Sequence, residues 1–110
     1  MLVAVLTAEL LFPGAGSLKD KRRRLVGLTA RIRSAFPVSV AEVARQELWQ
    51  RGTIGVALVT TDARLAQSVL DRITDGIGRN GEVELLSRRI EFFRPEEGVT
   101  DAFPGEGGWE

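Results

Sequence analysis

Side chains alternate in character over the eleven residues from Leu2 to Phe12, and this period of two constrains the fold more than any other feature of the chain. One alternate set is uniformly apolar, whereas the other includes Thr7 and Glu9. Successive residues of a strand face opposite sides of its sheet, so the pattern predicts a strand with one face on a core. The apolar set is Leu2, Ala4, Leu6, Ala8, Leu10 and Phe12.

A helical period follows the turn at 13–16, which contains one proline and two glycines. Ser17 is a candidate N-cap, with Asp20 three residues on, and Pro37 stops the stretch. Between these limits the apolar residues recur at spacings of three, four and seven, which indicates one stripe on a helix that ends at Phe36. The stripe is Leu18, Leu25, Leu28, Ile32 and Ala35.

Three further strands and a second helix complete the pattern. The predicted strands are Val38–Val43, Thr53–Thr61 and Glu82–Phe93. The alternation slips near Glu42, which predicts a bulge there. Asp62 can cap the second helix, and Gly78 can end it. Its apolar residues repeat every four positions and are Leu65, Val69, Ile73 and Ile77.

The predicted order is therefore β-α-β-β-α-β. This is the α+β, ferredoxin-like arrangement, in which a four-stranded antiparallel sheet carries two helices on one face. We expect one ferredoxin-like domain over residues 1–95. Residues 96–110 are acidic, rich in glycine and lack periodicity, which predicts a flexible tail. Trp109 in that tail has no evident core to join, so its role is left open.

Composition removes several function classes. The chain has no cysteine and no histidine, which excludes disulfides, thiolate zinc sites, a cysteine nucleophile and a histidine base. No catalytic motif, metal site or cofactor is predicted, although catalysis by Ser, Thr, Asp or Glu stays open. No apolar run approaches the ~20 residues of a membrane span. The N-terminus lacks the basic region of a signal peptide.

The charges cancel, fifteen against fifteen, but they are unevenly spread. Seven cations and one acid lie between Ser17 and Phe36, whereas six acids and one cation lie between Glu91 and Glu110. A basic helix of this kind can bind RNA phosphates, while the alternative is an ordinary solvated helix face. The candidate nucleic-acid-binding residues are Lys19, Arg22, Arg23, Arg24, Arg31 and Arg33. Lys21 projects near the apolar stripe, and we expect its long side chain to reach out to solvent.

The turn before this helix is a second candidate site. Free amides at a helix N-terminus attract anions, and nearby lysines would add charge. The candidate anion-binding residues are Gly14, Gly16, Ser17 and Lys21. A plain strand-to-helix turn explains the glycines equally simply. This alternative makes the protein a regulatory domain for a small anion or metabolite.

The sheet face opposite the helices is a third candidate site. We interpret it as the interface of a homodimer with no catalytic activity, while the alternative is an ordinary half-polar sheet surface. Its predicted residues are Val3, Val5, Thr7, Glu9, Ser39, Ala41, Gly55 and Ala57. Glu9 and Glu42 could act in acid–base chemistry or hold Mg²⁺. Structural ion pairs with Arg45 and Arg51 are the favoured interpretation of these two carboxylates. Trp49, in the connection at 45–52, is interpreted as a lid over the edge of the core.

Three segments resemble a known family. They are Ser17–Arg23, Val38–Val43, and Leu48–Arg51 followed by Gly55–Ala57 and Asp62–Arg64. Together they resemble the bacterial YlxP-like family, a domain of unknown function, over about residues 1–93. The resemblance implies a ferredoxin-like fold and a cytoplasmic protein. Its members are often encoded near translation-initiation and ribosome-maturation genes, which implies a connection with RNA or the ribosome. No catalytic residues are established for that family, so the resemblance implies none in this chain.

Overall fold

The computed structural model describes residues 1–98, and its elements follow the predicted order with one short helix added at the end. They are β1 (Leu2–Leu11), α1 (Leu18–Ala35), β2 (Ser39–Ala44), β3 (Arg51–Thr60), α2 (Ala63–Gly78), β4 (Glu84–Phe93) and α3 (Pro95–Gly98). The N-terminal ammonium group of Met1 forms an ion pair with Glu96 of α3. Most of the predicted tail, including Trp109, lies outside the described residues.

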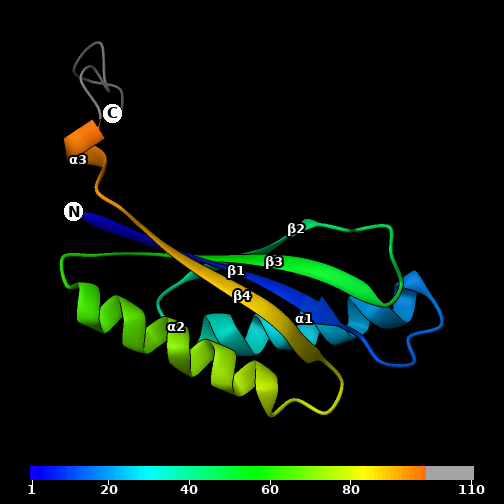
Figure 1. Ribbon diagram of the computed structural model, residues 1–110. Helices are drawn as coiled ribbons and strands as arrows, with labels where there is room; N and C mark the ends of the chain where they lie inside the picture. The colour runs from blue at the N-terminus through cyan, green and yellow to red at the C-terminus, as the bar shows by residue number, and fades with distance from the viewer. Residues whose placement is uncertain (99–110) are drawn as a thin grey trace, which may run out of the picture.

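The four strands form one sheet in the order β2-β3-β1-β4, and every neighbouring pair is antiparallel. Both long helices lie on the same side of this sheet and run in opposite directions (Figure 1). The first turns of α1 therefore lie at the same end of the molecule as the last turns of α2. This is the predicted ferredoxin-like fold. No helix in the described part of the chain is long and apolar enough to cross a membrane.

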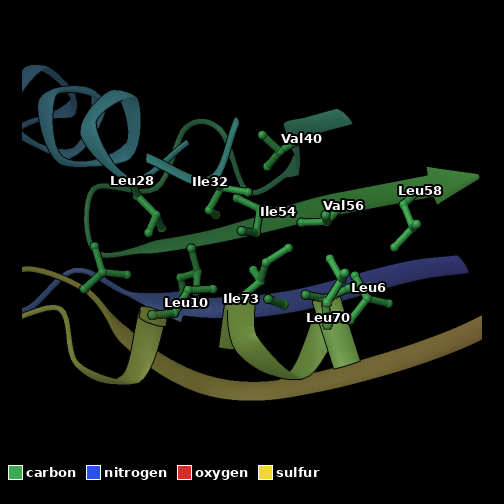
Figure 2. Close-up of a cluster of buried hydrophobic side chains, with 14 of the residues drawn as sticks. Leu6, Leu10, Leu28, Ile32, Val40, Ile54, Val56, Leu58, Leu70 and Ile73 are labelled. Atoms are coloured by element: carbon green, nitrogen blue, oxygen red, sulfur yellow. The ribbon is translucent and has the colours of Figure 1, made fainter. Parts of the chain in front are cut away.

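The core lies between the helices and the sheet. All six alternate apolar residues of the first predicted strand have no exposed surface, which confirms the period-two prediction. Figure 2 shows Leu6 and Leu10 of β1 among buried side chains of α2 and β3. Burying one large apolar side chain contributes roughly 1.5–3 kcal/mol to the free energy of folding. The buried residues of β1 therefore stabilise the fold at the centre of the sheet.

Both helices begin at the predicted caps. The Ser17 hydroxyl accepts a hydrogen bond from the Asp20 amide at 3.0 Å, and the Asp62 carboxylate accepts from two amides of the first turn of α2. The predicted stripe of α2 is wrong at Leu65, which is 52% exposed. Leu65 lies in the first turn, and the neighbouring Ala66 is buried instead.

The bulge predicted near Glu42 is present, because the register of β2 on β3 shifts between Glu42 and Ala44. Glu42 pairs with Ile54, whose side chain is buried on the helix side of the sheet. The connection that follows opens at Arg45 with φ of 62°, in the left-handed region. Trp49 in this connection is 53% exposed, so its interpretation as a lid over the core is wrong.

Candidate nucleic-acid interface

The predicted cations of α1 separate into two groups, and the first group is held by the protein itself. Arg23 bonds to the Asp20 carboxylate at 3.0 Å and also reaches Glu82 at 3.4 Å. Arg24 bonds to Asp20 at 3.0 Å and to two backbone carbonyls, those of Pro13 and Glu82. These bonds from Arg23 and Arg24 hold the pKa of Asp20 below its ordinary value. Arg23 and Arg24 thus fasten α1 to neighbouring segments.

Arg33 also belongs to this first group. Its guanidinium donates a hydrogen bond to the backbone carbonyl of Val40 at 2.9 Å, which ties the last turn of α1 to β2. Half of the six predicted nucleic-acid contacts therefore have partners within the protein.

The second group is exposed and consists of Lys19, Arg22 and Arg31. Within residues 1–98, none of their side chains forms a hydrogen bond or an ion pair with another residue. At 3.6 residues per turn, Arg22 and Arg31 lie on opposite flanks of α1 with Lys19 between them. The cations therefore cover the outer half of the helix and do not form a single row.

A groove with a volume of about 540 Å³ runs between α1 and the end of α2. We call it the arginine groove, and its lining residues are Arg23, Arg24, Gly27, Arg31, Gly76, Arg79, Asn80 and Glu82. Four of these are arginines and one is a glutamate, so positive charge is in excess. The groove is polar and has no aromatic or aliphatic wall.

Two glycines shape the arginine groove. Gly27 of α1 and Gly76 of α2 present bare backbone where other residues would project into it. A Cβ at Gly27 would lie 3.9 Å from a terminal nitrogen of Arg31, so the guanidinium of Arg31 rests beside that bare turn. The opposing wall carries Arg79, the C-cap residue of α2.

Sequence reasoning missed Arg79, because it considered the basic run of the first helix alone. The signal was present in the predicted topology. Two antiparallel helices on one sheet face place the end of the second helix beside the start of the first, and Arg79 directly follows Gly78, the predicted helix end. In the described residues, the Arg79 side chain forms no ion pair.

The predicted anion-binding loop has a different character. Gly14 has φ of +69°, in the left-handed region that favours glycine, and the Ser17 hydroxyl is engaged in capping α1. Lys21 is only 1% exposed, so the expectation that it reaches solvent is wrong. Its ammonium group lies 2.8 Å from a carboxylate oxygen of Glu42 and donates to the Arg45 carbonyl at 2.8 Å. Anion binding by the amides near Gly14 and Gly16 stays a prediction.

The two carboxylates of the first strands do not form a pair. Glu42 faces the helices, whereas Glu9 is on the opposite face, where it accepts from Thr53 at 2.8 Å and pairs with Arg45 at 3.1 Å. These donors, Thr53 first, hold the pKa of Glu9 below its ordinary value. The predicted ion pair of Glu9 with Arg45 is confirmed, whereas Arg51 as a partner is wrong, because Glu42 pairs with Lys21 instead. Residues 1–98 contain no cluster of three acidic side chains that could hold a metal ion.

Comparisons with known proteins agree with this fold. The model of DUF503, described as a protein of unknown function, matches residues 3–90. The uncharacterized protein YlxP of Bacillus subtilis (strain 168) is 32% identical over 92 residues, which cover 84% of this chain and 100% of that protein. A de novo designed protein, Foldit4, superimposes with a TM-score of 0.52 at 14% identity, covering 86% of this chain and 98% of the design, and shares the fold alone.

Proposed function

The chain belongs to the DUF503 family of proteins of unknown function, and we propose that it is a binding module that holds RNA, alone or in a ribosomal assembly, through α1 and the arginine groove. The observation that carries this proposal is the position of Arg31 and Arg79. They come from two different helices, line one groove and lack carboxylate partners within residues 1–98. A cytoplasmic location is part of the proposal.

The chemistry of the arginine groove favours a phosphate backbone over an enclosed metabolite. Small-molecule sites are mostly apolar and bury most of their ligand, whereas this groove is open and lined by guanidinium groups, an amide and bare backbone. Guanidinium forks match phosphate oxygens well. No aromatic side chain lines the groove, so we expect contacts to phosphates and little reading of base sequence.

The surface around the groove extends the same chemistry. Lys19 and Arg22 are exposed on the first turns of α1, and Lys19 lies between Arg22 and the flank of α1 that lines the groove. A strand of RNA that crosses the outer half of α1 therefore meets Lys19 and Arg22 before it enters the groove. Each phosphate contact releases counterions, so binding must weaken steeply as salt rises.

Charge reversal tests the proposal. The double variant Arg31→Glu/Arg79→Glu removes the two unpaired arginines of the groove, and Arg64→Glu/Arg94→Glu makes the same change in net charge at exposed positions that do not line it. Filter binding is measured with a 20-base-pair RNA hairpin and a 20-nucleotide single strand between 25 and 300 mM KCl. We expect the groove variant to bind at least roughly tenfold more weakly at low salt, and its salt slope to fall by about one to two units.

The control variant should retain affinity within roughly threefold, since it only lowers the general attraction for a polyanion. Circular dichroism confirms that both variants are folded. The proposal is refuted if the wild type binds neither RNA at 25 mM KCl, or if both double variants lose affinity equally.

A further inference from the structure

One face of the sheet is covered by neither helix (Figure 1). Register places the side chains of Val3, Val59 and Phe93 in one row across β3, β1 and β4 on this bare face. Val59 is 66% exposed and Phe93 is 48% exposed. Large apolar side chains at these exposures across three adjacent strands are typical of an interaction surface.

The bare face is also hollowed. A depression of about 280 Å³ lies over β2 and β3, and nearly all of its walls are apolar. Its floor consists of small residues, including Ala41, Gly55 and Ala57, and Val43 rises beside it. A Cβ at Gly55 would lie 3.2 Å from a methyl of Val43, so a side chain there would press on Val43 and fill part of the hollow. The bare face thus carries both projecting side chains and a hollow that can receive them.

The charges of the bare face balance one another: two ion pairs lie on it, and one further cation, Arg51, and one further acid, Glu84, lie on either side of Leu11. Glu9 pairs with Arg45 at 3.1 Å, and Arg89 pairs with Glu91 on β4 at 3.2 Å. The face therefore offers no excess of charge to a polyanion. Two such faces can approach each other without electrostatic repulsion, because each is locally neutral.

The size of the bare face suits a dimer. Three strands of ten residues and one of six, about 4.8 Å apart and with about 3.3 Å per residue, cover roughly 570 Å² in projection. A standard interface buries about 800 Å² on each partner. The solvent-accessible area of the bare face is larger than its projected area, because its side chains protrude, and it is therefore comparable with this value.

From this neutral, apolar and self-complementary surface, we propose that two copies of this chain pack sheet against sheet through the bare face. The interface is isologous, so the valines and Phe93 of each copy meet the bare face of the other. The proposal does not depend on RNA binding, because the arginine groove lies on the helix side.

A pair of matched valines tests this dimer. Val59 lies on the bare face and Val26 lies on the outer surface of α1, and both are 66% exposed. Sedimentation equilibrium at 10–200 μM is measured for the wild type, Val59→Glu and Val26→Glu. We expect the wild type and Val26→Glu to show about twice the chain mass of 12.0 kDa, and Val59→Glu to be monomeric or at least roughly a hundredfold weaker in association.

Val43→Lys, at a second position of the bare face with 54% exposure, repeats the test if Val59→Glu fails to fold. A wild type that stays monomeric at 200 μM overturns the proposal. A dimer that survives both bare-face variants also overturns it, since the contact must then lie elsewhere.

Discussion

The ammonium group of Lys21 lies 2.8 Å from a carboxylate oxygen of Glu42, and together they join the first turns of α1 to the bulge of β2. The same ammonium donates to the carbonyl of Arg45 and lies 5.9 Å from the centre of the Phe12 ring. A lysine is tolerated at 1% exposure because its charge has these partners. The pair holds the bulge and the following connection against α1.

Removing the lysine charge alone should therefore destabilise the protein strongly. Lys21→Met leaves the Glu42 carboxylate half-buried and unpaired, and we expect a loss of about 3 kcal/mol in the free energy of unfolding. Urea denaturation measures it. Lys21→Met/Glu42→Leu should recover more than half of that loss, because an apolar pair of similar volume replaces the ion pair. Lys19→Met, at an exposed position of the same helix, is the control and should change stability by less than about 0.5 kcal/mol.

Stability should fall with acid, and Glu9 accounts for part of the fall. The folded protein holds the pKa of Glu9 below its ordinary value through the Thr53 hydroxyl and then Arg45. The stabilisation is therefore complete above the ordinary glutamate pKa, about 4.3, and is lost as the pH falls through the lower folded pKa. We expect urea midpoints to decrease between about pH 5 and 3, and Glu9→Gln to reduce that decrease. An unchanged pH slope in Glu9→Gln would contradict the assignment.

Some acid sensitivity should remain in Glu9→Gln. Hydrogen bonds from Arg23 and Arg88 lower the pKa values of Asp20 and Asp71 respectively, and these carboxylates act in the same direction.

Gly52 should tolerate no side chain. A Cβ there would lie 3.0 Å from the ring of Phe12 and 3.4 Å from the stem of Lys21, both of which are buried. We expect Gly52→Ala to cost about 1–3 kcal/mol through overpacking, measured by thermal and urea unfolding. Gly76→Ala is the matched control, because nothing lies within 4 Å of its added methyl and α2 gains a better helix former. Equal stability of the two variants would show that Phe12 can move aside.

Periodicity was sufficient to predict the sheet, because burial on one face of β1 leaves a direct signature in the order of residues. All six apolar positions from Leu2 to Phe12 are buried, and the slip of alternation at Glu42 marks a real bulge. These features depend on local patterns alone. The same logic failed at Leu65, since a repeat of four drifts by about 40° per step from the 3.6-residue period of a helix, and the buried face therefore passes through Ala66.

The candidate site was less accessible to sequence reasoning, because it depends on which segments meet. Lys21 projected onto the core side of α1, but its partner Glu42 could be placed only once the register across the bulge was known. Arg23, Arg24 and Arg33 appeared as free cations because their acceptors lie in other segments, including Glu82 and the carbonyl of Val40. Arg79 was missed for the converse reason, since it enters the groove from the far helix.

Both long helices share one side of the sheet, which makes the molecule a plate with two unlike surfaces (Figure 1). A ligand on one surface leaves the other free, so the proposed RNA binding and the proposed self-association would not compete. In a back-to-back pair the two arginine grooves point in opposite directions, and a single assembly is divalent. Such a pair would bridge two separate stretches of phosphate backbone, with a gain in avidity that either half alone lacks.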